Sequence, residues 1–334
     1  VANHSSFIDI LALLSETPKM VILVKEWVYN SPIFGPCIRF AGYPFSGDGT
    51  EKNLELIQQK LEAGYQVVIF PEGTRSVDGN IGRFHKGAFL AAKQLNVKVQ
   101  PVVLVGLNWT NPKNDIMINP GEFYVKYLPE LDPNDFESYQ ILTKHTQAVM
   151  RSTLKESLIF DTTARFWRFP VLQNYLLKGP ILEWYVRVKY HLEAEHYISY
   201  NRLIGNRKKI YDIGCGLGYL DFLLHYSATD RQIVGIDADE EKILTASNGL
   251  YNQEQLSFVK SDVVDFAYES ADVFIINDLL HYLSHQQQEI LLSKVIEKLN
   301  PNGLLIIREG IKDGKGAENT RRTEIWSSKI LKFN

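Results

Sequence analysis

The stretch Lys209-Ile210-Tyr211-Asp212-Ile213-Gly214-Cys215-Gly216-Leu217-Gly218 decides the fold of the C-terminal part of the chain. Its first five residues are β-prone and run directly into a glycine-rich turn, after which residues 219–226 predict a helix. A glycine-rich turn between a strand and a helix brings the backbone close to a nucleotide-like ligand. Taken alone, the turn fits a dinucleotide as well as any other ligand of this class.

Further strands follow this turn at regular intervals. Residues 232–236, 256–260, 272–277 and 304–308 are short β-prone runs, and residues 286–299 predict a helix before the last of them. The second strand ends at Asp237, 25 positions after Asp212, where a carboxylate can accept hydrogen bonds from both hydroxyls of a ribose. Strands that alternate with helices predict an α/β fold.

The pattern Asp212-x-Gly214-x-Gly216-x-Gly218, together with these strands, resembles the class I S-adenosylmethionine-dependent methyltransferase family. The resemblance implies a Rossmann-like domain with S-adenosylmethionine as its cofactor. It implies cofactor contacts from the turn (Asp212, Gly214, Gly216 and Gly218), from Asp237 at the ribose, from Asp262 at the adenine, and from Val263 and Asn277 beside it. The alternative for Asp262 is a helix N-cap. The family's fold has two more strands after the fifth, so we expect the domain to be cut at its C-terminal end.

His281 lies where such enzymes often carry residues on the side of the methyl acceptor. A hydroxyl acceptor needs a base, so His281 is a candidate for that role, and the alternative is a helix-start residue without chemistry. A methyltransferase fold that only senses S-adenosylmethionine is a further alternative for the whole domain.

A second set of motifs stands at the N-terminal end. Asn3-His4-Ser5-Ser6-Phe7-Ile8-Asp9 leads into an apolar run, and a carboxylate five residues after a histidine can orient its imidazole as a general base. The alternative is a helix cap beside a surface histidine. Residues 66–70 then predict a strand that delivers Pro71-Glu72-Gly73-Thr74-Arg75-Ser76. Arg83-Phe84-His85-Lys86-Gly87, a helix at 88–95 and a buried strand at 97–105 follow.

This order of motifs resembles the glycerophospholipid acyltransferase superfamily, whose best-known members acylate lysophosphatidic acid. The resemblance covers about residues 1–130 and implies an α/β acyltransferase domain that lacks its N-terminal end. It implies that His4 is the general base, that Asp9 holds it, and that an acceptor hydroxyl attacks an acyl thioester of coenzyme A or acyl carrier protein. Glu72, Gly73, Thr74 and Arg75 would line the substrate site. Lys86 is a candidate anion contact, with a solvated surface lysine as the alternative.

One departure from the family concerns the acceptor. The family's second motif usually carries an arginine that grips the acceptor phosphate, whereas residues 42–49 here contain none and include Asp48. Arginine is the preferred bidentate ligand for phosphate, and an aspartate repels it. We therefore expect an acceptor other than lysophosphatidic acid.

Composition limits the remaining classes of function. The net charge of −3 argues against a nucleic-acid-binding protein. The two cysteines fall in different predicted domains, and no cysteine–histidine cluster has zinc spacing, so we expect neither a disulfide framework nor a metal site. The longest uncharged apolar stretch, residues 99–109, falls short of the roughly 20 residues of a spanning helix.

These observations predict three segments: an acyltransferase domain at 1–150, an aromatic and basic connector at 151–204, and a methyltransferase domain at 205–334. From residue 151 to 209 the chain carries 11 Lys/Arg and 5 Asp/Glu, an excess of +6, which suits an anionic membrane surface. The alternative is a linker that packs its aromatic residues between the two domains.

The whole order resembles composite bacterial proteins in which a membrane exporter precedes both domains. The resemblance implies a bifunctional transferase on the cytoplasmic face of the inner membrane, either peripheral or tethered by an upstream exporter domain. Its expected partners are a membrane surface, a lipid-like acceptor and acyl carrier protein. An alternative is a non-catalytic, lipid-binding acyltransferase-like scaffold attached to an active methyltransferase.

Overall fold

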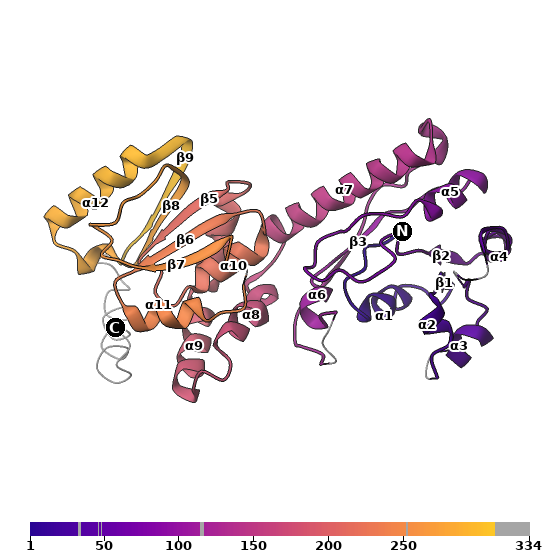
Figure 1. Ribbon diagram of the computed structural model, residues 1–334, viewed down its shortest axis with the longest axis horizontal. Coiled ribbons are helices and arrows are strands. Elements are labelled where there is room, and N and C mark those ends of the chain that lie inside the picture. Colours follow the sequence, from indigo (N-terminus) through magenta and orange to yellow (C-terminus); the bar gives the residue numbers. More distant parts are fainter. Residues whose placement is uncertain (33–34, 46, 48, 114–116, 252, 311–334) are drawn as a thin grey trace. The chain divides into compact units, whose positions relative to one another are not determined.

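Two pairs of short strands frame the N-terminal part of the chain (Figure 1). Strand β1 (Met20–Ile22) pairs in parallel with β2 (Gln66–Val68), and β3 (Val102–Val105) pairs antiparallel with β4 (Tyr124–Tyr127). Ala2 joins the two pairs, because it forms a parallel bridge with Val102 and donates its N–H to the Ile69 carbonyl. The segment that leads into His4 therefore lies between β2 and β3.

The computed structural model describes residues 1–310 except 33–34, 46, 48, 114–116 and 252. The chain divides into two units, Val1–Ser157 and Leu158–Asn334. The helices of the first unit are α1 (Ile8–Leu14), α2 (Glu26–Tyr29), α3 (Gly35–Phe40), α4 (Thr50–Glu62), α5 (Gly87–Gln94), α6 (Leu107–Thr110), the 3-10 turn η2 (Pro133–Asp135) and α7 (Tyr139–Phe160), which runs into the second unit. Their core gathers around the buried strand β3.

The second unit is built on a five-stranded parallel sheet. Its strands are β5 (Lys209–Ile213), β6 (Gln232–Asp237), β7 (Leu256–Lys260), β8 (Ala271–Asn277) and β9 (Leu299–Arg308), in the spatial order β7-β6-β5-β8-β9. The strand order reverses direction between β5 and β8, and a ligand in such a sheet binds outside the carboxyl ends of the strands at this point. The α/β fold and the Rossmann-like parallel sheet predicted from the sequence are confirmed.

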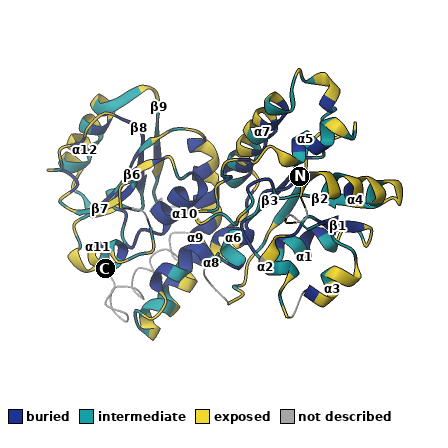
Figure 2. Cartoon of the chain, turned by 45° about the vertical axis from the view of Figure 1, so that its right-hand side comes forward, coloured by how far each residue is buried: buried dark blue, intermediate teal, exposed yellow. Residues whose placement is uncertain are grey.

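Helices cover both faces of this sheet. Helix α12 (His285–Lys298) packs on one face through Leu291 and Val295. Helix α10 (Tyr219–Ser227) lies on the other face, where Phe222 contacts the ring of Phe258 on β7, and all of its residues are buried (Figure 2). The shorter α11 (Glu240–Ser247) and the 3-10 turn η4 (Leu280–Tyr282) complete the unit.

The last strand begins earlier than the sequence predicted. Pro301-Asn302-Gly303 was expected to separate a helix ending at residue 299 from a strand starting at 304, whereas β9 already starts at Leu299. The strand accommodates these residues through a register irregularity against β8, and Asn302 takes a left-handed conformation with φ of 61°.

Residues 151–204, expected to connect the two domains, are helical throughout most of their length. They supply the last turns of α7, then α8 (Ala164–Leu172), the 3-10 turn η3 (Gln173–Tyr175) and α9 (Pro180–Ile204). From Leu158 onward they belong to the second unit. Arg231 fixes α9 there, because its buried guanidinium donates to Asn201 Oδ1 at 2.7 Å and to the Gly205 carbonyl at 2.7 Å. No helix in the described part of the chain combines the length and apolar character needed to cross a bilayer.

Candidate active sites

The first unit brings His4 and Asp9 into direct contact. His4 Nδ1 lies 2.8 Å from Asp9 Oδ2, and the same carboxylate oxygen accepts the N–H groups of Ser5 and Ser6 at 2.6 and 2.9 Å. Asp9 is fully buried in the first turn of α1. Because the two backbone N–H groups fix the carboxylate, the carboxylate in turn fixes the imidazole ring.

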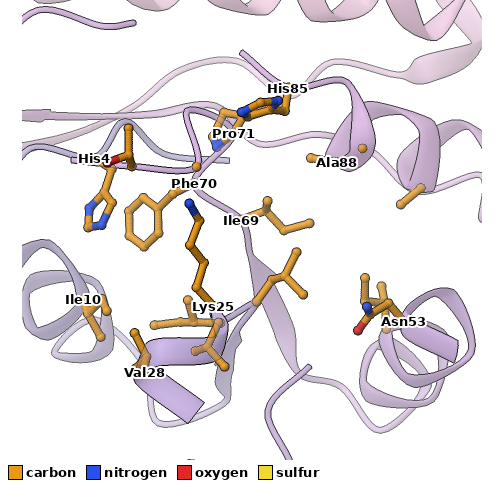
Figure 3. Close-up of a pocket in the computed structure, with 18 of the residues that line it drawn as sticks. His4, Ile10, Lys25, Val28, Asn53, Ile69, Phe70, Pro71, His85 and Ala88 are labelled. Atoms are coloured by element: carbon orange, nitrogen blue, oxygen red, sulfur yellow. The ribbon is translucent and has the colours of Figure 1, made fainter. Parts of the chain in front are cut away.

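The second edge of the imidazole lies at a pocket. The His4 ring stacks on Phe70, with 4.3 Å between the ring centroids, and His4 contributes to the pocket wall (Figure 3). Among the described residues, His4 Nε2 has no hydrogen-bond partner. A hydroxyl that enters the pocket can therefore reach a ring nitrogen that is oriented from behind by a carboxylate.

The pocket has a volume of about 600 Å³. Much of its wall is apolar and comes from α1, α2, α4, α5 and the carboxyl ends of β1 and β2; this part includes Ile10, Ile22, Val24, Val28, Leu54, Ile57, Ile69, Leu90 and Ala91. Its polar end carries cations, namely Lys25, Arg75 and Lys113, together with His85, and no described aspartate or glutamate lines it. Such a pocket combines a space for a hydrocarbon chain with a positively charged end.

The loop after β2 carries most of the predicted substrate residues. Gly73, Thr74 and Arg75 line the pocket. Gly73 has φ of 66°, and a Cβ there would meet the His85 ring at 3.1 Å and approach Lys25 Nζ at 3.8 Å. A side chain at this position would therefore fill the polar end of the pocket.

Glu72 lies behind the pocket wall. One of its carboxylate oxygens accepts the His4 N–H at 2.9 Å and the other accepts the Gly82 N–H at 2.7 Å. Burial raises the pKa of Glu72, while these two N–H groups and the nearby His4 lower it. Glu72 thus holds His4 through its backbone. Lys86 stands exposed before α5, outside the pocket lining.

Lys25 and Lys113 are pocket cations to which the sequence assigned no role. Lys25 follows β1 by three residues, and its ammonium points towards the Phe70–Pro71 corner (Figure 3). Because β1 and β2 are parallel neighbours, the residues after their carboxyl ends meet at one edge, and this rule could have placed Lys25 beside Phe70 and Gly73. Lys113 Nζ donates to Thr74 Oγ1 at 3.3 Å. Asp48, on which the sequence argument also relied, lies outside the described residues.

In the second unit, the glycine turn folds back over the ends of the strands. Gly214, Gly216 and Gly218 all have positive φ angles, of 79°, 56° and 79°. A Cβ at Gly218 would lie 2.7 Å from the Phe258 ring, whereas one at Gly216 would meet no atom within 4 Å. The turn is therefore packed at Gly218 and open at Gly216, where a ligand can approach the backbone.

Asp237 is bound to this open glycine. Its Oδ2 accepts the Gly216 N–H at 2.8 Å, and its Oδ1 accepts the Asp239 N–H at 2.9 Å. A carboxylate has about four acceptor positions, so two remain for further donors. Asp237, the residue predicted to bind the ribose, thus lies at the carboxyl end of β6, beside the turn.

Two acids are buried beneath the turn. Asp212 on β5 is 4% exposed and Asp221 on α10 is 0% exposed. Burial raises the pKa of Asp212 to about 7, and burial together with the charge of Asp212 raises the pKa of Asp221 well above its usual range. Among the described residues, neither carboxyl is paired with a cation, and both oxygens of Asp221 lack a donor. Their raised pKa values predict that the two carboxyls share a proton.

The other predicted cofactor residues occupy different surroundings. Asp262 is exposed, and its Oδ1 accepts the Val264 N–H at 2.8 Å, so it caps a turn. Val263 is 5% exposed and belongs to the hydrophobic core. Asn277, at the end of β8, accepts from the Tyr200 hydroxyl at 3.0 Å. All of them follow the carboxyl ends of β7 or β8, on the same edge of the sheet as the turn.

His281 is oriented by a carboxylate that the sequence did not indicate. Its Nδ1 lies 2.9 Å from Glu309 Oε2, and the other oxygen of Glu309 accepts the Leu280 N–H at 2.6 Å. Nearby, Arg308 binds Glu193 of α9 at 2.6 Å and Asp278 at 2.9 Å. The sequence gives no signal for the contact between Arg308 and Glu193, because Glu193 lies in the segment predicted to be a connector.

Comparison with known proteins finds a family match within each unit. Residues 1–105 match the Acyltransferase family, and residues 204–328 match a family described as a methyltransferase domain. The chain carries an acyltransferase domain and a methyltransferase domain. Among the described residues, no group of three or more histidine, cysteine, aspartate or glutamate side chains is arranged to hold a metal ion.

Individual relatives cover one domain each. The chloroplastic 1-acyl-sn-glycerol-3-phosphate acyltransferase LPAT1 of Arabidopsis thaliana is 36% identical over 110 residues, which are 32% of this chain and 31% of that protein. A carboxy-S-adenosyl-L-methionine synthase of Shewanella oneidensis is 26% identical over 117 residues, 34% of this chain and 48% of that protein. The chain spans between 31% and 60% of the length of five acyltransferase relatives.

Solved structures also match one domain each. The 1-acyl-sn-glycerophosphate acyltransferase PlsC of Thermotoga maritima is 30% identical, with a TM-score of 0.42, and the match covers 46% of this chain and 64% of that one. The N-methyltransferase NodS of Bradyrhizobium japonicum is 20% identical, with a TM-score of 0.32, and the match covers 40% of this chain and 73% of that one.

Proposed function

We propose that the chain is a bifunctional transferase, which acylates a hydroxyl of a lipid-like acceptor and transfers a methyl group from S-adenosylmethionine to a second acceptor. The observation that carries the acyl half is the His4–Asp9 contact of 2.8 Å at the wall of a pocket with an apolar part and a cationic end. The similarity to the Acyltransferase family over residues 1–105 supports the same reaction class.

The geometry suits general-base catalysis of acyl transfer. His4 Nε2 takes the proton of the acceptor hydroxyl while the hydroxyl oxygen attacks the carbonyl carbon of an acyl thioester. The new ester forms as the carbon–sulfur bond of the thioester breaks. The proton then leaves with the thiol. Buried Asp9 stabilises the imidazolium that forms in between. The thioester comes from coenzyme A or acyl carrier protein, and the apolar part of the pocket receives its acyl chain.

The His4→Ala variant distinguishes an active acyltransferase from a non-catalytic scaffold. We expect His4→Ala to lower the release of free thiol from an acyl thioester by about 10²- to 10⁴-fold, the usual contribution of a general base. The matched control is His196→Ala, an exposed histidine on α9 in the other unit. Equal turnover by the wild type and His4→Ala would show that the N-terminal unit does not use this mechanism.

The cations of the pocket define the acceptor more closely. Without an arginine in residues 42–49, the sequence suggested an acceptor without a phosphate, but Lys25, Arg75 and Lys113 provide positive charge at the same pocket. An anionic group on the acceptor, such as a phosphate, is therefore favoured. We infer an acceptor that carries both a hydroxyl and an anionic group.

Lys25 offers the test of this acceptor. A hydrogen bond to a charged group contributes about 1.5–3 kcal/mol, so we expect Lys25→Ala to raise the KM for lysophosphatidic acid by about 10- to 100-fold. The KM for an uncharged monoacylglycerol should stay the same. Lys19→Ala is the matched control, because exposed Lys19 precedes β1 at its opposite end. An equal effect on both acceptors would place the anion elsewhere.

The methyl half rests on the fit of the turn to S-adenosylmethionine. When bound, this cofactor supplies an activated methyl group on a positively charged sulfur. The chain offers open backbone at Gly216 and free acceptor positions on Asp237. The carboxylate of Asp237 favours a cationic ligand over the pyrophosphate of a dinucleotide. The similarity to methyltransferase domains over residues 204–328 supports the same cofactor.

His281 and Glu309 define the acceptor side of this domain. An imidazole oriented by a carboxylate can take a proton from a hydroxyl acceptor, and the pair lies after β8 and β9, on the edge that carries the turn.

We propose that the protein works at the cytoplasmic face of a membrane, with a lipid-like acyl acceptor and with acyl carrier protein or coenzyme A as the acyl carrier. The similarity to acyltransferases named for a lysophospholipid substrate supports the lipid-like acceptor.

A further inference from the structure

Helix α9 carries an exposed apolar stripe along its first three turns. Ile181, Trp184, Val188 and Leu192 are 60%, 50%, 39% and 54% exposed, although their side chains are large and apolar. At 3.6 residues per turn, they fall within about 80° of the helix circumference. The opposite side of the helix is buried, and Figure 2 shows both buried and exposed surface on α9.

The loop before the helix also presents apolar side chains to solvent. Leu176 and Leu177 are 39% and 98% exposed, and Leu177 has φ of 64°, a conformation that disfavours a leucine. The loop is nevertheless held in place, because Leu177 N–H donates to Glu183 Oε1 at 2.8 Å and Lys178 Nζ donates to the Thr245 carbonyl at 2.7 Å. These hydrogen bonds hold the loop in place while it presents the apolar side chain of Leu177 to solvent. We interpret such an exposed apolar surface as a contact site for another molecule.

Positive charge accompanies this stripe. Arg187 lies beside it on α9 with 48% of its side chain exposed, at 3.9 Å from Glu183. At the same helical spacing Lys189 borders the other edge of the stripe, with 35% of its side chain exposed, at 3.6 Å from Glu193. The whole segment 151–209 holds 11 Lys/Arg against 5 Asp/Glu.

We propose that the stripe of Ile181, Trp184, Val188 and Leu192, together with Leu176 and Leu177 of the preceding loop, docks the methyltransferase unit on an anionic lipid surface. Apolar side chains enter the interfacial region of the bilayer, the tryptophan lies at the level of the head groups, and Arg187 and Lys189 at the edges of the stripe meet anionic lipids. The stripe ends where Glu195 takes the next position on the same face, so the docking surface is confined to one end of α9. The proposal is independent of either catalytic mechanism.

The chain offers a closely matched pair of variants for the test. Ile181→Glu/Leu192→Glu places two charges on the stripe. Ile296→Glu/Leu244→Glu makes the same substitutions on α12 and α11, at residues 62% and 56% exposed. Both variants should unfold at the same temperature as the wild type, because all four side chains are exposed. Co-sedimentation of the full chain with phosphatidylcholine vesicles, with and without phosphatidylserine, measures binding.

We expect the wild type and the α11/α12 variant to bind vesicles that contain phosphatidylserine and to bind pure phosphatidylcholine more weakly. The stripe variant should bind the anionic vesicles at least tenfold more weakly. Equal binding by all three proteins would overturn the proposal, and so would equal loss in both variants. A wild-type dimer that only the stripe variant dissociates, without any vesicle binding, would assign the surface to a second copy of the chain and would also overturn it.

Discussion

The buried pair Asp212–Asp221 predicts an unusual dependence of stability on pH. Both carboxyls have pKa values raised by burial, so the folded chain binds more protons than the unfolded chain above the ordinary pKa of about 4. The free energy of unfolding of the second unit therefore falls as the pH rises from about 4 through 7, and the loss is complete above the folded pKa values. This direction is opposite to that of a carboxylate held by a cation.

Asp221→Asn removes the part of this loss that comes from Asp221, whose pKa is raised by burial and by the charge of Asp212. The new amide can donate to Asp212. The shift of Asp212, from 3.8 to about 7 because of burial, sets the scale of such a penalty at about 4 kcal/mol, at about 1.4 kcal/mol per pH unit. Structural relaxation and water reduce such penalties, so we expect the variant to be more stable than the wild type by about 1–3 kcal/mol at pH 8. At pH 4 the difference should shrink towards zero.

Calorimetric unfolding of the full chain at pH 4, 6 and 8 measures this effect. Asp265→Asn is the control, because Asp265 is an exposed acid of the same unit and the substitution changes the net charge equally. The refuting result is an Asp221→Asn protein that is less stable than the wild type at pH 8, or one whose gain is the same at every pH. Either would show that the two carboxyls do not share a proton.

Three further predictions follow from single contacts. Asp9→Asn should lower acyl transfer, measured as thiol release, by about 10²- to 10⁴-fold. Its unfolding temperature, measured by calorimetry, should not change, and full activity would mean that the carboxylate does not orient the base. Arg231→Met leaves buried acceptors unpaired and should destabilise the second unit by about 2–4 kcal/mol in urea unfolding, and no change would contradict its anchoring role. Gly218→Ala and Gly216→Ala both place a side chain at a positive φ, but only the Cβ at Gly218 would also clash with Phe258, so Gly218→Ala should destabilise the unit more. Gly216→Ala should mainly weaken binding of S-adenosylmethionine in calorimetry; the reverse order would contradict the open turn.

The parts of the fold that sequence alone predicted are those with strong local signals. The strand Leu256–Lys260 has the predicted bounds, because its apolar run is bounded by polar residues on both sides. The start of β9 was wrong, because Pro301-Asn302-Gly303 has the composition of a turn, and only pairing with β8 keeps it in a strand. Local propensity could not include that tertiary contribution.

The sites show the same division. The His4–Asp9 contact followed from a spacing of five residues, and the glycine turn followed from its own composition. Lys25 and Glu309 were not assigned, because each reaches its site through the packing of elements distant in sequence. The aromatic and basic composition of residues 151–204 suggested a connector, and the contacts of Arg231 with α9 could not be read from it.

The central claim is that one chain holds two independent sites, and one set of calorimetric titrations tests it most directly. The chain, Asp237→Ala and His4→Ala are each titrated with S-adenosylmethionine and with a nicotinamide dinucleotide. We predict that the wild type and His4→Ala bind S-adenosylmethionine equally, that Asp237→Ala binds it about 10- to 100-fold more weakly, and that none binds the dinucleotide appreciably. Tight binding of the dinucleotide without binding of S-adenosylmethionine would contradict the account.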